Sequence, residues 1–450
     1  MKQSQLILSQ TPSFSVPLRF FMTAPLFGVV AALLMLFLDG SQFANRWSSG
    51  MLAYTHLLVL GYLAMVMQAA LLQVVSVLTG GQPRQVGLSA VVMHVALIVG
   101  TLLLATGFLT GVPHFMHTAV LLLVLSFAVL IGVMISGLLR STARRDAGFG
   151  IGLALACLMI TVGLGAWLAI GHSAQGVVLA RHLTDIHLGW GLLGWGAILL
   201  ITVAYAVVPM FQLTPAYPSA VIRCLTPVIV IGLLAWAGGA VADFSKLSLV
   251  GGFVVAAGLV LFAVTTLWLQ GKRKKKPASE VTLWFWRCAM LSLLVVVFIW
   301  LAAQIFPELS KHPAYPLLFG VLMIHGVLIS AVNGMLYKIL PFLTWLHLSI
   351  KVTEHKLSRR LIPNIKKLLP DNRTHIQFWI HLLMLLLMVA ATLQPGWFLL
   401  LPAGVVFAAS NLLLWLNLMA VLKIYKETCK KITEAAKEKI AVASPTAQPT

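Results

Sequence analysis

Charged side chains are scarce in this chain. Only 9% of its 450 residues are Asp, Glu, Lys or Arg, whereas 60% are hydrophobic and the mean hydropathy is +0.98. A soluble domain ordinarily has about 25% charged residues, because they keep its surface in water. The shortage excludes an ordinary soluble fold and indicates that lipid surrounds most of the protein.

Acidic residues are the rarest charged group, with 11 Asp and Glu against 31 Lys and Arg. They fall in loops, tails or helix ends, and Asp185 is the one closest to the interior of the bundle. Proton pumps and proton-coupled transporters generally place carboxylates inside the membrane, so proton transport is not indicated. The polar residues within the apolar stretches are neutral instead: Gln68, Gln73, Asn333, Asn411 and Asn417.

Cysteine is also rare. Three of the four cysteines fall inside apolar stretches and Cys429 falls in the basic tail, with no CxxC spacing among them. This pattern provides neither a disulfide framework nor a cysteine metal motif. Redox chemistry by thiols is therefore not expected.

Long apolar runs are abundant, each close to the length of about 20 residues that crosses a bilayer as a helix. Strands of a membrane β-barrel would alternate in polarity, but the segment 120–139 is apolar on nearly every face. The predicted fold is an all-α integral membrane bundle of about twelve helices, one transmembrane domain over residues 1–430. We predict the spans at 17–39, 50–78, 86–110, 113–140, 148–171, 183–210, 219–242, 246–270, 281–305, 314–345, 374–393 and 396–424.

The basic residues indicate the orientation, because short cytoplasmic loops retain Lys and Arg during insertion. With both chain ends inside (N-in and C-in), the opposite loops hold almost nothing basic, namely Arg46, Arg181, Lys246 and Lys311. The net charge of +20 is thus spread over short loops rather than over a folded domain. We expect the lipid bilayer as partner, no nucleic acid, and the inner (cytoplasmic) membrane of a bacterium.

Two cytoplasmic segments stand out by composition. Residues 349–372 mix Leu, Ile and basic residues, a pattern that favours an amphipathic helix lying on the inner leaflet. Residues 431–450 are predicted as a basic tail that becomes disordered towards its end.

The sequence contains signs of an internal repeat. The ends of the spans at 183–210 and 314–345 align with each other, and the span at 50–78 ends in a weaker version. Because these spans are four apart, we predict three pseudo-repeats of four helices, at about 17–140, 148–270 and 281–424. Convergent helix endings are the alternative. The aligned positions are Tyr205 with Tyr337, and Pro209 with Pro341 and Ser76.

The same three spans each carry a histidine in their outer half: His56, His187 and His325. An imidazole in hydrocarbon costs free energy unless its nitrogens are satisfied, and neutral imidazole is a good ligand for heme iron or copper. Glycines near His187 and His325 leave room for a flat macrocycle. Hydrogen bonding between helices is the alternative role for the three, and the role expected of the other embedded histidines, His94, His117 and His381.

This pattern resembles the heme-copper oxidase subunit I superfamily, the large subunits of cytochrome c oxidase and nitric oxide reductase, over most of the chain. The resemblance implies twelve helices in three arcs and a low-spin heme b with His56 and His325 as its axial ligands. It also implies that His187 is a copper ligand, and that a c-type cytochrome or quinol and other respiratory subunits are partners.

The sequence departs from that family in its copper site. The family's seventh helix carries an adjacent pair of copper-ligating histidines, but residues 219–243 contain none. Met323 stands where the family's tenth helix has a second histidine, and Tyr205 lies far beyond His187. These departures imply a heme-binding protein without the usual heme-copper binuclear catalysis, concerned with electron transfer or with nitric oxide or oxygen.

Two other functions fit the same sequence. Twelve helices with both ends inside is also a common plan of secondary transporters and permeases. An assembly factor that handles heme or copper for a respiratory complex would keep the histidines without catalysis. The sequence does not decide whether the protein is an enzyme.

Overall fold

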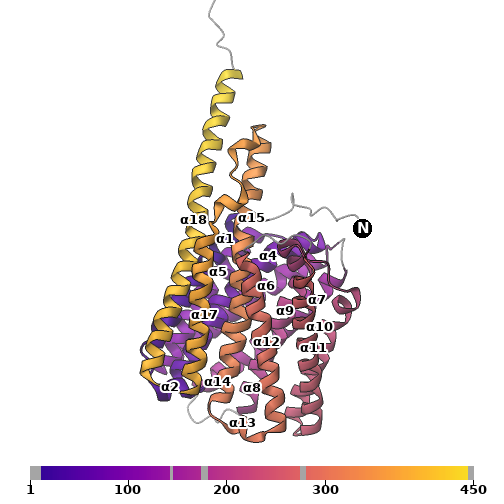
Figure 1. Ribbon diagram of the computed structural model, residues 1–450, viewed down its shortest axis with the longest axis vertical. Helices are drawn as coiled ribbons and strands as arrows, with labels where there is room; N and C mark the ends of the chain where they lie inside the picture. The colour runs from indigo at the N-terminus through magenta and orange to yellow at the C-terminus, as the bar shows by residue number, and fades with distance from the viewer. Residues whose placement is uncertain (1–11, 142–144, 174–180, 274–279, 444–450) are drawn as a thin grey trace, which may run out of the picture.

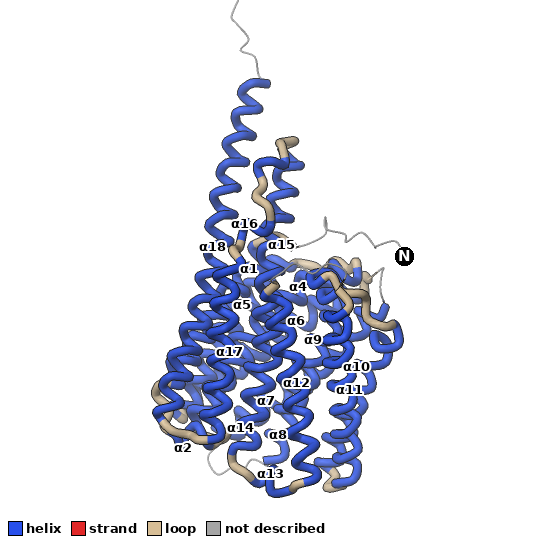
Figure 2. The backbone as a smooth tube through the Cα atoms, viewed as in Figure 1, coloured by secondary structure: helices blue, strands red, loops and turns tan. Residues whose placement is uncertain are grey.

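The computed structural model describes residues 12–141, 145–173, 181–273 and 280–443. Within these ranges every regular element is a helix and there is no strand (Figure 2). The predicted all-α class is confirmed. It follows from the solvent, since in hydrocarbon a helix satisfies its main-chain donors and acceptors within one segment.

Twelve of the described helices or helix runs are long and apolar enough to cross a membrane, which confirms the predicted bundle. Short elements connect some of them at the ends of the bundle: α2 (Gly40–Ala44), α13 (Pro307–Lys311), η5 (Arg359–Leu361) and α16 (Ile365–Leu368). The spans are α1 (Ser15–Met35); α3 (Ser49–His56), η2 (Leu57–Ala64) and α4 (Met65–Thr79); α5 (Val86–Thr110); α6 (Pro113–Leu138); α7 (Arg145–Ser173); α8 (Arg181–Gly189), η3 (Trp190–Ala197) and α9 (Ile198–Gln212); α10 (Ser219–Val241); α11 (Ser245–Gly271); α12 (Val281–Ile305); α14 (Ala314–Val321), η4 (Leu322–Ile329) and α15 (Ser330–Glu354); α17 (Asp371–Leu393); and α18 (Trp397–Ala443).

The helices run roughly parallel to one long axis, and the described chain begins and ends at the same end of the bundle (Figure 1). That end is uppermost in Figure 1, where α18 extends beyond the bundle, and α2 and α13 lie at the lower end. An even number of spans requires the first and the last of them to have their outer ends on the same side of the membrane. The upper end therefore carries the loops in which the basic residues are concentrated.

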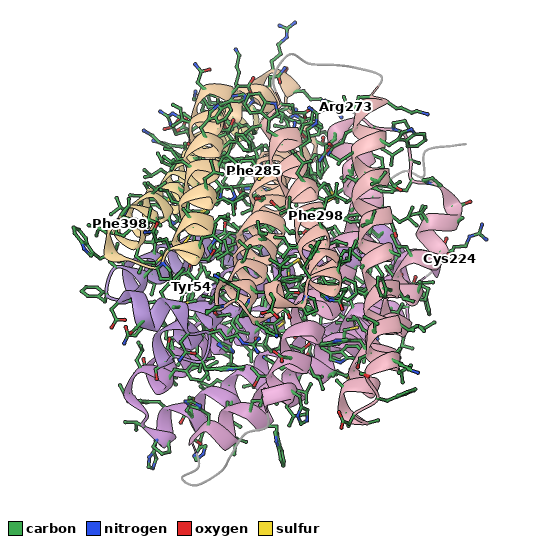
Figure 3. The ribbon with its side chains drawn as sticks, turned by 60° about the horizontal axis from the view of Figure 1, so that its bottom comes forward. Tyr54, Cys224, Arg273, Phe285, Phe298 and Phe398 are labelled. Atoms are coloured by element: carbon green, nitrogen blue, oxygen red, sulfur yellow. The ribbon has the colours of Figure 1, made fainter. Side chains whose placement is uncertain are left out.

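The outside of the bundle is apolar. Phe298 and Phe398 are 69% and 51% exposed, whereas Tyr54 and Phe285 are buried. Figure 3 shows Phe398 at the edge of the bundle and Tyr54 and Phe285 within it. Such a surface is stable only against hydrocarbon, so the protein contacts the lipid bilayer over its sides.

Three spans contain an eight-residue π-helix in their lower half: η2, η3 and η4. They begin at residues 57, 190 and 322, and so are 133 and 132 residues apart. Ser76, Pro209 and Pro341, which the sequence aligns, each lie 19 residues after the start of the π-helix in their own span. The backbone geometry therefore has the same register as the sequence repeat.

Each π-helix has a glycine at its fifth residue, and each glycine faces the preceding long helix. A Cβ on Gly61 would overlap the ring of Phe27 on α1. The same atom on Gly194 would lie 3.1 Å from the Cβ of Cys157 on α7, and on Gly326 it would lie 2.6 Å from the Oγ of Ser292 on α12. The first and second long helices of each predicted unit therefore approach each other closely at the same register.

The segment after the tenth span does not form the predicted surface helix. α15 continues to Glu354 beside the extended end of α18 (Figure 1). Leu348, Val352 and Ile432 are almost completely buried in a small apolar cluster of their own. The apolar residues of 349–372 are thus covered in part by α18 rather than by lipid. The predicted basic tail is helical from residue 431 to Ala443, and 444–450 lie outside the described residues.

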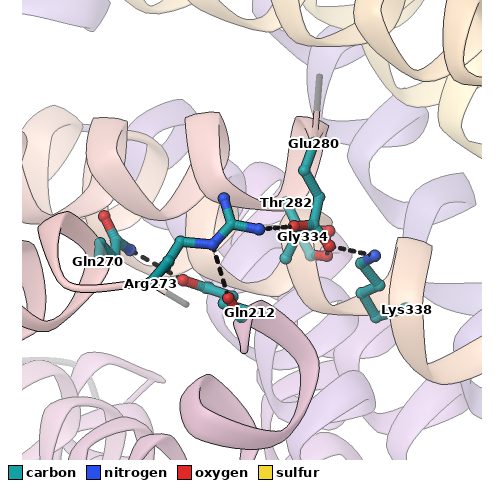
Figure 4. Close-up of polar contacts among 7 residues, drawn as sticks. All are labelled: Gln212, Gln270, Arg273, Glu280, Thr282, Gly334 and Lys338. Atoms are coloured by element: carbon teal, nitrogen blue, oxygen red, sulfur yellow. Dashed lines mark hydrogen bonds and ion pairs between the residues drawn. The ribbon is translucent and has the colours of Figure 1, made fainter. Parts of the chain in front are cut away.

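A polar network ties four spans together at the upper end (Figure 4). The Arg273 guanidinium donates to the main-chain oxygen of Gln212 at 2.7 Å and to the carboxylate of Glu280. Glu280 also forms an ion pair with Lys338, and the Gln270 amide donates to the side-chain oxygen of Gln212 at 3.0 Å. Arg273 is buried and Glu280 is largely so, with side chains only 5% and 11% exposed. One carboxylate therefore pairs with two cations in a region of restricted solvation, and the three groups keep a net charge of +1.

Candidate functional site

Two of the three predicted histidines lie together. The ring centres of His56, on α3, and His187, on α8, are 6.5 Å apart, and the ring planes differ by 15°. Both side chains are half-buried in the lower half of the bundle. Two residues 131 positions apart in sequence thus bring nearly parallel imidazoles to one place.

Both rings are held by the same kind of hydrogen bond. Nδ1 of His56 lies 2.7 Å from the main-chain oxygen of Leu52, and Nδ1 of His187 lies 3.0 Å from that of Thr161 on α7. A carbonyl oxygen can only accept, so Nδ1 carries the proton in both rings. Each Nε2 then has a free lone pair, and neither has a hydrogen-bond partner among the described residues. This is the tautomer that metal-ligating histidines adopt.

Aromatic residues fix the His56 side of the pair. The ring centre of Phe108, on α5, lies 5.1 Å from that of His56. Phe108 also meets the ring of His172, edge-on, with the ring centres 5.4 Å apart. The His56 imidazole is therefore confined by an apolar ring as well as by its bond to Leu52, which limits its rotation.

The third predicted histidine, His325, lies in a different polar cluster. It is 1% exposed, and its Nε2 lies 3.0 Å from the hydroxyl of Tyr54. Its Nδ1 has no hydrogen-bond partner among the described residues. Tyr54 and His56 are two residues apart on one helix and so point to nearly opposite sides. The structure thus pairs His56 with His187, and His325 with Tyr54.

The register of the π-helices explains this separation. His56 precedes η2 by one residue and His187 precedes η3 by three, whereas His325 is the fourth residue of η4. The position of His187 corresponds to Tyr54 in the first unit. The three histidines lie on equivalent helices but at different depths. Only His56 and His187 lie next to each other.

The remaining embedded histidines each have a hydroxyl partner. Nε2 of His94 lies 3.0 Å from Thr23, that of His117 lies 3.1 Å from Ser173, and that of His381 lies 2.8 Å from Ser330. These contacts agree with the packing role expected of them.

The pair can serve only a metal that needs few protein ligands. Among the described residues no group of three or more His, Cys, Asp or Glu side chains could hold a metal ion. Two ligands are sufficient for heme iron, whose macrocycle supplies four nitrogens, or for two-coordinate cuprous copper. The ring centres of His56 and His187 are 6.5 Å apart, which is close enough for both imidazoles to serve one such metal, and they would hold it through Nε2.

A cavity of about 480 Å³ opens at the lower end, between α8, α10, α11, α12 and α14. Tryptophans 236 and 300 are among its lining residues, and the Arg46–Asp185 ion pair stands at its polar part. This cavity was not predicted from the sequence. The available signal was the set of glycines near the histidines, since Gly189 and Gly320 line it.

Fold and site together define an all-helical integral membrane protein. In the lower half of its bundle two histidines lie side by side, each with Nδ1 bonded to a main-chain carbonyl and Nε2 unbonded. No protein-family model matches the chain, and no curated protein matches it.

Proposed function

We propose that this protein is a membrane-embedded redox protein that binds a heme b or a copper ion between His56 and His187. One observation carries the proposal: two nearly parallel imidazoles 6.5 Å apart, each with Nδ1 bonded to a main-chain carbonyl and Nε2 free. Because Nδ1 of each ring is already the donor to a carbonyl, Nε2 is the nitrogen that each ring would offer to a metal.

The bound metal would supply a one-electron centre inside the bilayer. The protein's contribution is to set the tautomer, fix the ring planes and keep the site away from bulk water. The chain provides no further ligands for the binuclear centre of the oxidases, because residues 219–243 contain no histidine. Electron transfer, or binding of nitric oxide or oxygen at the metal, therefore accounts for the residues better than oxygen reduction of the ordinary kind.

Kinship with the oxidase large subunits is part of the proposal. Its support is the agreement between the sequence repeat and the π-helices, which share one register through all three units. Three units of four helices is the plan that the resemblance implies. In the inner membrane of a bacterium the basic upper end would face the cytoplasm and the histidine pair would lie towards the outer side.

The test begins with protein purified from a host supplied with heme and copper. We expect a Soret band or stoichiometric copper in the wild type. His56→Ala and His187→Ala should each abolish the signal, because one imidazole alone holds the centre weakly. His94→Ala is the matched control, since it removes a half-buried histidine whose Nε2 has a hydroxyl partner.

The variant His325→Ala separates the two possible axial pairs. If His56 and His187 hold the centre, His325→Ala keeps the metal or heme. If His56 and His325 hold it, as the resemblance implies, His325→Ala loses the low-spin signal and His187→Ala keeps it. Wild-type protein with neither heme nor copper, from a host that loads other heme proteins, would refute the proposal.

A further inference from the structure

Arg287 lies within a membrane span, and its side chain is exposed. It is the seventh residue of α12, about 9 Å along the helix from its upper end. It has no hydrogen bond, ion pair or ring contact with any of the described residues. A guanidinium has five N–H donors and keeps its charge, so this position is costly unless an acceptor lies against the helix. The described part of the chain does not provide that acceptor.

Arg287 stands at the upper end of a stripe of α12 that faces lipid. Leu291, Val295 and Phe298 are all exposed, and they follow Arg287 at spacings of 4, 4 and 3 residues. These spacings place the four side chains on one face of the helix. A cation followed by three apolar groups towards the membrane centre has the same order as the phosphate and acyl chains of a phospholipid. The stripe therefore matches one lipid molecule lying along α12.

Two tryptophans mark the depth of the lipid head groups beside Arg287. Trp284 lies about one turn above Arg287, and its ring centre is 5.7 Å from that of the exposed Trp379 on α17. Tryptophan is enriched at the boundary between hydrocarbon and head groups. Side chains of an α-helix lean towards its N-terminus, and α12 has its N-terminus at the upper end. The Arg287 guanidinium therefore extends towards the level of the head groups.

The charges around this surface favour an anionic head group. α12 contains no Asp or Glu, and Asp371 is the only one in α17, about two turns above the tryptophan of that helix. Glu280, just before α12, is already paired with two cations. A zwitterionic head group would therefore bring its ammonium beside Arg287 without a carboxylate to receive it. The glycerol head group of phosphatidylglycerol has only hydroxyls at that place.

We propose that Arg287 binds the phosphate of an anionic phospholipid of the phosphatidylglycerol type, in the leaflet at the upper end of the bundle. The planar guanidinium can donate to two phosphate oxygens at once. One acyl chain lies along Leu291, Val295 and Phe298, and the two tryptophans lie beside the head group. This site is separate from the proposed metal centre, which lies in the lower half of the bundle, so either proposal can fail without the other.

The experiment is a lipid titration followed by native mass spectrometry. Full-length protein, delipidated in detergent, is mixed with phosphatidylglycerol or with phosphatidylcholine of the same acyl chains. We expect the wild type to bind its first phosphatidylglycerol at least about fivefold more tightly, which is the contribution of one arginine at a lipid surface. Arg287→Gln should lose this preference. Arg223→Gln is the matched control and should keep it, because Arg223 is exposed near the upper end of α10 and its Nε already donates to the main-chain oxygen of Ser219.

Equal affinity of the wild type for the two lipids would overturn the proposal, and this comparison needs no variant that could misfold. An unchanged preference in Arg287→Gln would overturn it as well. Inorganic phosphate should not displace the lipid; if it does, the arginine binds a free anion and not a lipid. A protein subunit that is lost on purification of Arg287→Gln, while lipid binding stays the same, would assign Arg287 to a subunit contact instead.

Discussion

Glu280 is the sole carboxylate in the network that holds the upper end of four spans, and Glu280→Ala should strongly destabilise the protein. Arg273, with a side chain 5% exposed, would keep its charge but lose its counter-ion. Breaking a buried ion pair on one side costs about 3–5 kcal/mol. The contact with the more exposed Lys338 adds at most about 1 kcal/mol. The ratio of folded to unfolded protein should therefore fall by roughly 2 to 4 powers of ten.

The assay is equilibrium unfolding in mixed micelles titrated with sodium dodecyl sulfate, followed by tryptophan fluorescence. The control is Glu308→Ala, which removes the partner of Lys311 from an ion pair whose side chains are 82% and 67% exposed. That variant should unfold like the wild type. A second substitution, Arg273→Met in the Glu280→Ala background, should recover most of the loss because it removes the unpaired charge. If Glu280→Ala is no less stable than Glu308→Ala, the network does not carry the stability assigned to it.

Three further predictions concern other parts of the bundle. Gly61→Leu should destabilise by about 1–3 kcal/mol through overpacking against α1, measured by the same unfolding assay, and wild-type stability would contradict the close approach of the two helices. Tyr54→Phe should cost about 1–3 kcal/mol, because it leaves Nε2 of the buried His325 without a partner; a neutral result would mean that water replaces the hydroxyl. Hydrogen bonds from Ser41 and Gln42 lower the pKa of Asp39 below 3.8, so its capping of α2 is complete above that pH and is lost as the pH falls through the lowered pKa. Hydrogen exchange of the α2 amides should rise there, and Asp39→Asn should remove the transition.

The membrane spans could be predicted because hydropathy is a property of each segment alone. The predicted and observed limits agree within a few residues for most of the twelve. The exceptions are α15 and α18, which continue well past the predicted ends at 345 and 424. Their extensions are polar, and what supports them is contact between each other, as at Val352 and Ile432. A contact between segments 80 residues apart cannot be predicted from the composition of either segment alone.

The candidate site could be predicted only in part, for a related reason. The sequence identified the spans that carry His56, His187 and His325, because helix register and residue type are local. The sequence did not show that His56 would pair with His187 rather than with His325. That pairing depends on how each π-helix rotates the side chains of its span. The contact between Tyr54 and His325 could not be predicted, because a tyrosine in an apolar run is common and does not indicate a partner. In the sequence, Trp236 and Trp300 likewise look like any other membrane tryptophan. The glycines that they contact, Gly189 and Gly252, lie on other helices.

Because of the three π-helices, which side chains of these spans face the bundle and which face lipid depends on the exact number of residues in each span. A π-helix joins residue i to i+5, so each segment holds more residues per turn than the α-helices on either side. Removing one residue from η2 would let the backbone rewind to an α-helix and rotate everything beyond it by about 100°. Polar side chains of α4, such as Gln68, would then turn towards lipid. Length variation in this protein should therefore be confined to its loops, and the three spans should tolerate substitution far better than deletion.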